Sequence, residues 1–87
     1  MPIISSFYGI IIQMFFNENA GHHTPHFHAS FAEFEAVYDL DGNRMEGDMP
    51  KSKEKLIEAW IEIHRDELFA AWKAARLGEK IKIEGLK

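Results

Sequence analysis

Residues 26–43 read HFHASFAEFEAVYDLDGN, and their alternation of apolar with polar side chains is typical of half-buried β-strands. We predict strands over residues 26–31 and 33–40, joined by a short hairpin step. Residues 41–43, Asp-Gly-Asn, form a clear turn signal, because these residue types tolerate the backbone angles of tight turns. The buried face of the second strand would carry Phe34, Ala36, Tyr38 and Leu40. This stretch favours an antiparallel sheet with one buried face.

Two further strands are predicted on either side of this pair. Residues 8–16 (YGIIIQMFF) are rich in β-branched and aromatic side chains, and both of their faces are largely apolar, which is typical of a central strand. A short strand over residues 44–46 is predicted to follow the turn. Pro25 stands at the start of a strand, where a proline is tolerated. We therefore expect a small antiparallel sheet of three to four strands.

A helix is predicted over residues 52–77, which contain neither Gly nor Pro and consist mostly of strong helix formers. Apolar positions recur there every three or four residues, so they share one stripe of the helix. The stripe consists of Ile57, Trp60, Ile61, His64, Leu68, Ala71, Trp72 and Ala75. Ser52 is predicted to cap the N-terminus and Gly78 to follow the C-terminus.

A single helix of this length would extend about 39 Å, so a break near residues 64–66 is the alternative. Residues 79–85 alternate charged and apolar side chains, which predicts a short edge strand. The expected fold class is α+β, in which the small antiparallel sheet is packed by a long or broken C-terminal helix.

The composition indicates one globular domain over residues 1–87, and a hydrophobic fraction of 46% is sufficient for a packed core. Ten Lys and Arg stand against 14 Asp and Glu, and the net charge of −4 argues against strong binding of RNA. The chain has no cysteine, which excludes disulfides and thiolate metal sites. Because it has no signal-peptide pattern and no long apolar run, we expect a cytoplasmic protein with no membrane partner.

Four of the five histidines, His22, His23, His26 and His28, lie within seven positions. Histidine titrates near neutral pH, so such a cluster can move protons, bind a metal or report pH. Strand geometry places His26 and His28 on one face and Phe27 on the other. If Phe27 packs under the helix, both histidines are predicted to point outward.

One interpretation of the cluster is a metal site. His22, His26 and His28 have a spacing suited to three imidazole ligands of Zn²⁺ or a similar divalent ion, with water in the fourth position. Glu18, Glu35 and Asp39 are candidate carboxylate ligands.

A second interpretation needs no metal: one histidine acts as general base and another as general acid, as in phosphodiester cleavage assisted by a 2′-hydroxyl. Arg44, Lys51 or Arg65 would then stabilise the charge that develops on the phosphate. A third interpretation is structural, with the histidines capping strand ends and forming part of a protein-binding surface. His64 on the helix stripe is either a core histidine or a further member of the cluster, oriented by Glu67.

The whole chain resembles a family of small bacterial proteins known as domain of unknown function 4160. The motifs that carry the resemblance are Phe7-Tyr8-Gly9-Ile10, Phe16-Asn17-Glu18, Pro25-His26-Phe27-His28, Glu35-Ala36-Val37, Gly47-Asp48-Met49-Pro50 and Trp60-x-x-x-His64-Arg65-Asp66-Glu67-Leu68-x-x-x-Trp72. The family motif singles out His26, His28 and His64 as candidate catalytic residues. Its upstream histidine matches either His22 or His23, because this chain doubles that residue.

The resemblance implies a toxin of a bacterial toxin–antitoxin module, acting on RNA or another growth-essential target through the histidine cluster. Its partner would be a cognate small protein of the antitoxin kind. The alternatives are a non-enzymatic interaction module, whose exposed sheet face binds a partner protein or pairs with itself as a homodimer, and a small histidine-rich metal-binding protein. The sequence leaves open whether the protein is an enzyme.

Overall fold

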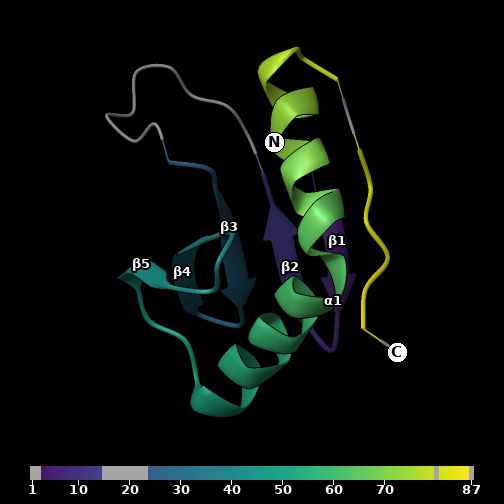
Figure 1. Ribbon diagram of the computed structural model, residues 1–87. Helices are drawn as coiled ribbons and strands as arrows, with labels where there is room; N and C mark the ends of the chain where they lie inside the picture. Colours follow the sequence, from purple (N-terminus) through teal and green to yellow (C-terminus); the bar gives the residue numbers. More distant parts are fainter. Residues whose placement is uncertain (1–2, 15–23, 80, 87) are drawn as a thin grey trace.

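The computed structural model, which describes residues 3–14, 24–79 and 81–86, consists of one antiparallel sheet and one helix (Figure 1). The strands lie in the sheet in the order in which they follow in the sequence. They are β1 (Ile3–Phe7), β2 (Ile10–Gln13), β3 (His26–Phe31), β4 (Phe34–Asp39) and β5 (Arg44–Gly47), and the helix is α1 (Lys51–Arg76). The α+β class is therefore confirmed, and the predicted strands in residues 26–46 are found within one or two residues of their expected bounds.

The sheet has five strands rather than three to four, because one predicted strand begins with a hairpin turn. Tyr8 and Gly9 both adopt positive φ, 49° and 80°, and join β1 to β2. Two-residue hairpin loops of type I′ need positive φ at both central positions, and Gly is the residue that adopts such angles without strain. The apolar residues from position 8 onward predicted one continuous strand. The turn at Tyr8 and Gly9, and β1 in front of it, were therefore not predicted.

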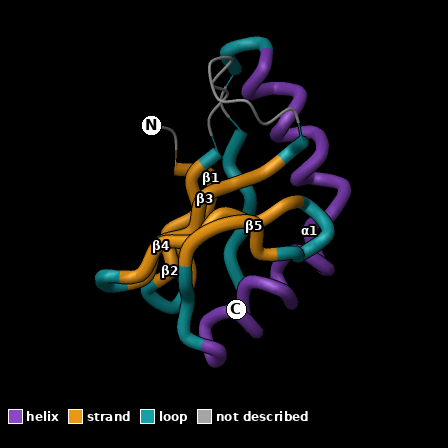
Figure 2. Tube along the Cα trace, turned by 90° about the vertical axis from the view of Figure 1, so that its left-hand side faces the viewer, coloured by secondary structure: helices purple, strands orange, loops and turns teal. Residues whose placement is uncertain are grey.

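The buried face of the sheet packs under α1 (Figure 2). Ile10, Ile12 and Phe27 are completely or almost completely buried on this face, together with Trp60 from the helix. Phe27 stands edge-on to the Trp60 indole, with ring centroids 5.7 Å apart and an interplanar angle of 84°. Apolar burial of this kind contributes about 25 cal/mol per Å² of surface removed from water, so this layer stabilises the packing of α1 on the sheet.

The helix is long and also kinked, so the two predicted alternatives are combined. His64 has non-helical backbone angles (φ −112°, ψ 24°), while the hydrogen-bonded helix continues to Arg76. It begins one residue before Ser52, and no side chain caps its N-terminus, so the predicted Ser52 cap is wrong. Within the described residues, no helix is apolar over a span long enough to cross a lipid bilayer.

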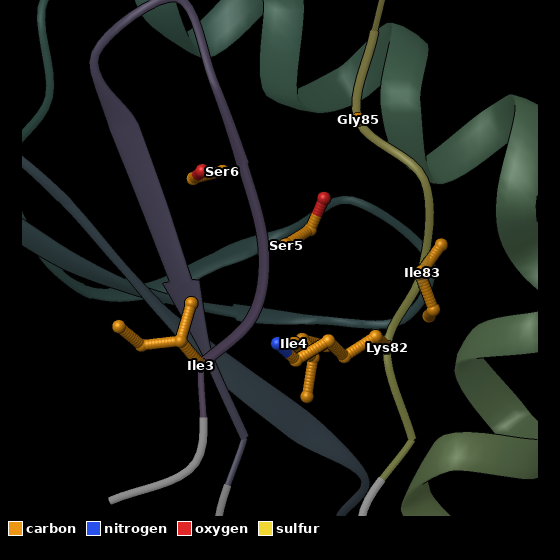
Figure 3. Close-up of a pocket in the computed structure, with 7 residues that line it drawn as sticks. All are labelled: Ile3, Ile4, Ser5, Ser6, Lys82, Ile83 and Gly85. Carbon is orange, nitrogen blue, oxygen red and sulfur yellow. The ribbon is translucent and has the colours of Figure 1, made fainter.

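Residues 81–86 run beside β1 without becoming the predicted edge strand. The Ile83 N–H donates to the Ile4 carbonyl oxygen at 2.7 Å, and the Trp60 indole N–H donates to the Glu84 carbonyl oxygen at 2.9 Å. Residues of this segment and of β1 together line a cavity of about 210 Å³ (Figure 3). The bulge in β1 next to Ile4 interrupts its regular edge, which explains why a full ladder does not form there.

Gly47 is predicted to be indispensable for the β4–β5 pairing. It adopts φ +85°, and a Cβ there would collide with the Glu35 carbonyl oxygen and lie 2.8 Å from the Ala36 Cα. We expect Gly47→Ala to lower the free energy of unfolding by about 2 kcal/mol or more, because the obstacle is backbone. Gly42→Ala is the matched control, since its φ is +98° but nothing lies within 4 Å. Equal losses in urea unfolding of the two variants would contradict this prediction.

Candidate functional site

The face of the sheet opposite α1 is organised in rows, because residues paired across neighbouring strands point to the same side. One row crosses all five strands and consists of Ile3, Gln13, His28, Val37 and Glu46. The neighbouring row consists of Ser6, Ile11, Ser30 and Glu35. We call these nine residues the open face. His28 stands at its centre, on the middle strand.

The open face is apolar at one side and acidic at the other. Ile3 and Ile11, on β1 and β2, are 48% and 39% exposed. Glu35 and Glu46, on β4 and β5, are also exposed. None of the nine residues is a lysine or an arginine. The sheet therefore presents exposed aliphatic groups beside a negative charge, in contrast to the polar surface that usually covers the solvent side of an antiparallel sheet.

His28 is the half-buried imidazole between these two sides. Burial lowers its pKa below the ordinary value, and the nearby His26 lowers it further. The carboxylates of Glu35 and Glu46 raise the pKa of His28, but their effect is smaller than that of burial and of His26. The ring is therefore mostly neutral at pH 7, so one of its nitrogens can accept a proton or a hydrogen bond.

His26 does not point outward as predicted; it is only 8% exposed. Its ring centroid lies 5.2 Å from Trp72 on α1 and 5.7 Å from His28. Its Nδ1–H donates to the Thr24 carbonyl oxygen at 2.8 Å, since a carbonyl can only accept. The pairing of β2 with β3 ends at His28, so His26 lies beyond the paired part, where the second half of α1 covers it.

His64 lies in the helix layer, while His28 belongs to the face that this layer leaves uncovered. Its ring packs 5.9 Å from the Trp60 indole, and its Nδ1–H donates to the Glu67 carboxylate at 2.6 Å. Glu67 was expected to orient His64 if His64 joined the histidine cluster; the hydrogen bond is present, and membership of the cluster stays a prediction. The structure brings His26 and His28 together and joins His64 to Glu67. Catalytic roles for the three histidines stay predictions.

The described residues do not by themselves complete the predicted Zn²⁺ site. His22 and His23 lie outside them, and no three His, Cys, Asp or Glu side chains converge in the part of the chain that is described. The Asp39 carboxylate, a candidate ligand, instead accepts hydrogen bonds from the backbone of Asp41 and Asn43 in the turn. Two imidazoles are fewer than the three protein ligands of usual zinc centres. The site of His22, His26 and His28 stays a prediction.

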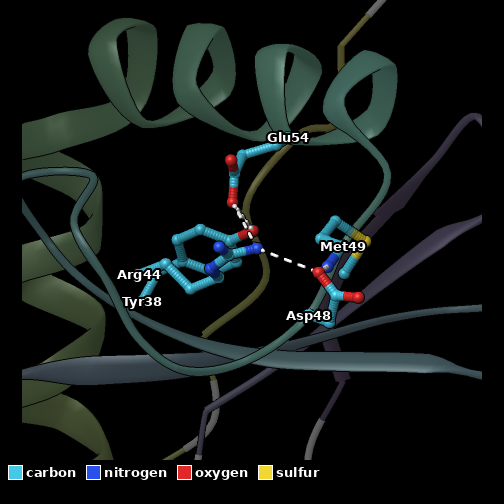
Figure 4. A network of polar contacts seen from close by, with 5 residues as sticks. All are labelled: Tyr38, Arg44, Asp48, Met49 and Glu54. Atoms are coloured by element: carbon cyan, nitrogen blue, oxygen red, sulfur yellow. Dashed lines mark hydrogen bonds and ion pairs between the residues drawn. The ribbon is translucent and has the colours of Figure 1, made fainter.

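A polar network that the sequence did not predict connects the sheet to the start of α1 (Figure 4). The Tyr38 hydroxyl donates to Glu54 Oε2 at 2.7 Å. Arg44 Nη1 lies 3.5 Å from the same oxygen and 3.3 Å from Asp48 Oδ1. Arg44 was a candidate for binding phosphate, but here it lies between two carboxylates, and Arg65 pairs with Asp41 at 3.0 Å. Only the buried position of a tyrosine in an otherwise apolar row could have indicated this network.

Tyr38→Phe is expected to destabilise the protein by about 1–2 kcal/mol near pH 7, because the hydrogen bond joins a phenol to a carboxylate. Burial and the bond to Glu54 raise the pKa of Tyr38 well above its ordinary value. Above about pH 10 the unfolded chain loses this proton while the folded chain keeps it, so wild-type stability falls as pH rises. The difference between wild type and variant in urea unfolding should therefore shrink by about pH 11.

The exposed Tyr8 supplies the control, since Tyr8→Phe is expected to leave both stability and its pH dependence unchanged. A Tyr38→Phe difference that stays constant or widens at high pH would contradict the assigned role of the phenol.

The comparisons with known proteins identify one family. The model of one protein family, described as domain of unknown function DUF4160, matches residues 9–73, which reach from the first hairpin turn to the second half of α1. Neither the curated proteins nor the solved structures give a match. Because the matched residues make up about three quarters of the sequence, the chain belongs to the DUF4160 family.

Proposed function

We propose that this protein is an interaction module that binds a partner protein through the open face. The observation that carries the proposal is that α1 packs on one side of the sheet, whereas Ile3 and Ile11 stay exposed on the other. Aliphatic side chains gathered in one exposed patch are typical of surfaces that bind another protein. Both side chains belong to rows of paired strands, which hold them on one side of the sheet.

The rigidity of the open face supports this function. The strands are paired along the first row from β1 to β5 and along the second row from β1 to β4, and the opposite side is held by the contact between Trp60 and Phe27. A rigid surface loses little conformational entropy on binding, so more of its contact energy appears as affinity. The partner expected from the family resemblance is a small protein encoded beside this one.

Ile11→Asp is predicted to weaken binding of the protein encoded beside this one by about tenfold or more. Loss of an apolar contact at the centre of an interface usually lowers the binding free energy by more than about 1 kcal/mol. Isothermal titration of the purified pair measures the effect. Ile63→Asp is the matched control, since Ile63 is 63% exposed but lies on α1. Unchanged binding by Ile11→Asp, or equal losses in both variants, would reject the open face as the binding surface. Circular dichroism must show that both variants are folded.

A second candidate function is a toxin that cleaves RNA, and the proximity of His26 and His28 favours it. Their ring centroids are 5.7 Å apart, and the lowered pKa of His28 leaves it a base at neutral pH. It ranks second because the acidic Glu35 and Glu46 beside His28 would repel a phosphate backbone.

The toxin candidate predicts that overexpression slows bacterial growth and that His28→Ala abolishes this inhibition in a folded protein. Growth curves with and without the neighbouring gene provide the measurement. Gln13→Ala removes the side chain paired with His28 in the same row and should leave the inhibition intact. If the wild-type protein does not slow growth at all, the toxin candidate fails.

A further inference from the structure

We infer that the cavity lined by β1 and residues 82–85 binds a short-chain aliphatic carboxylate, with Ser5 and Lys82 holding its charged head. The cavity lies at the edge of the sheet, because β1 is the last strand on that side. Its lining residues all lie outside residues 9–73, which match the DUF4160 family. This site goes beyond the proposed function, since partner binding through the open face does not require it.

The Ser5 hydroxyl points most directly to a ligand. Ser5 is only 6% exposed, and its Oγ has no hydrogen-bond partner in the described part of the chain. The residue lines the cavity, and in Figure 3 its side chain extends from β1 toward residues 82–85. Buried hydroxyl groups are normally paired, because an unpaired one has lost its water without gaining a partner. Ser5 therefore offers a hydrogen bond to a molecule in the cavity.

An irregularity in β1 explains why a serine is buried at this place. The register between β1 and β2 shifts between Ile3 and Ser5. Ile4 and Ser5 are consequently both buried, although successive residues of a regular strand point to opposite faces. Irregularities of this kind often direct a side chain into a functional site.

The other wall of the cavity is held by three contacts. The Ile83 N–H donates to the backbone of β1 at 2.7 Å, and the Trp60 indole N–H donates to the Glu84 carbonyl oxygen at 2.9 Å. Gly85 approaches β1 so closely that a Cβ there would lie 2.8 Å from the Ser6 carbonyl oxygen. Because both walls are fixed before a ligand arrives, little conformational entropy is lost on binding.

The lining residues select the ligand by polarity and by charge. Ile3, Ile4 and Ile83 supply aliphatic walls. Lys82 supplies a positive charge, and in Figure 3 its side chain extends back toward β1. An ammonium group favours an anion, and the Ser5 hydroxyl can donate to the same anion. A carboxylate on an aliphatic chain combines the two properties that these walls require.

The volume of the cavity limits the length of this chain. An engineered apolar cavity of about 150 Å³ holds one benzene molecule. By proportion, a cavity of about 210 Å³ holds about eight non-hydrogen atoms, which is the size of hexanoate. Hexanoate is therefore the probe that matches the site in size, polarity and charge.

Titration of three small molecules tests the inference. Hexanoate, acetate and hexan-1-ol are each added at neutral pH to the full-length ¹⁵N-labelled protein, and dissociation constants are taken from the amide shifts. Hexanoate carries the charged head and the chain, acetate carries only the head, and hexan-1-ol carries the chain without the charge. We expect hexanoate to bind about tenfold or more tightly than either, with its largest shifts at Ile4 and Ile83.

Two variants assign the groups that hold the head. Ser5→Ala is expected to weaken hexanoate binding about tenfold, because a hydrogen bond from a buried hydroxyl to a charged group is lost. Lys82→Met is expected to weaken it only about threefold, since water screens an ion pair at an exposed side chain. Ser30→Ala on β3 and Lys55→Met on α1 are the matched controls, because neither residue lines the cavity. Equal losses in variants and controls would overturn the inference.

The stability of the ligand-free Ser5→Ala protein gives a second measurement. This variant removes a buried hydroxyl that has no partner, so its midpoint of urea unfolding should rise while its affinity for hexanoate falls. An unchanged or lower midpoint would show that the hydroxyl is already satisfied in the free protein, and the site would be rejected.

Three outcomes of the titrations would also reject the site. Equal affinities for hexanoate and hexan-1-ol would show an apolar cavity in which charge has no role. Equal affinities for hexanoate and acetate would show adventitious binding of an anion only. If tens of millimolar hexanoate cause no shifts at Ile4 and Ile83, the cavity is not a ligand site. The titration with the protein encoded beside this one tests the open face independently of these results.

Discussion

The burial of Trp60 is the constraint on which the rest of the structure depends. Its indole contacts Phe27 of β3 and Phe7 of β1, and its N–H donates to the Glu84 carbonyl oxygen in the C-terminal segment. One side chain thus holds the helix, two strands and the last described residues together. Removing a fully buried aromatic side chain typically costs about 3–5 kcal/mol, which is a large share of the stability of so small a domain.

This constraint determines which side of the sheet is exposed. Since Trp60 lies on Phe27, the helix occupies the face of Ile12 and Tyr38, and the alternate residues of each strand are left on the other side. The kink at His64 lets the second half of α1 change direction, so that Trp72 meets His26 at the start of β3. The two histidines that strand geometry assigned to one face therefore have different surroundings. His26 is buried against the helix, and His28 stays at the centre of the open face.

The open face and the polar network have complementary roles in this arrangement. Tyr38, Arg44 and Glu54 keep opposite charges paired on the helix side, where they hold the start of α1 on the sheet. Glu35 and Glu46 are exposed and belong to the rows of the open face. A surface that combines exposed isoleucines with carboxylates is poorly suited to RNA, and for this reason we rank an interaction module above a nuclease.

Local patterns by themselves determined the fold class and most of the elements. Alternation over residues 26–40, the Asp-Gly-Asn turn and the absence of Gly and Pro from residues 52–77 each depend on a few neighbouring residues, so the strands and the helix could be predicted. The hairpin at Tyr8 and Gly9 could not, because a tyrosine with positive φ is stabilised by pairing that forms only in the folded sheet.

The candidate site was predictable only in part, for a similar reason. The period of two placed His28 on the strand face opposite Phe27, but it could not show that Trp72 covers His26 or that Tyr38 reaches Glu54. These contacts join residues far apart in the sequence, and they depend on which face the helix occupies. Residue types and their spacing thus determined most of the strands, the helix and the charge of the chain, whereas only the packing of Trp60 decided which side of the sheet stays open.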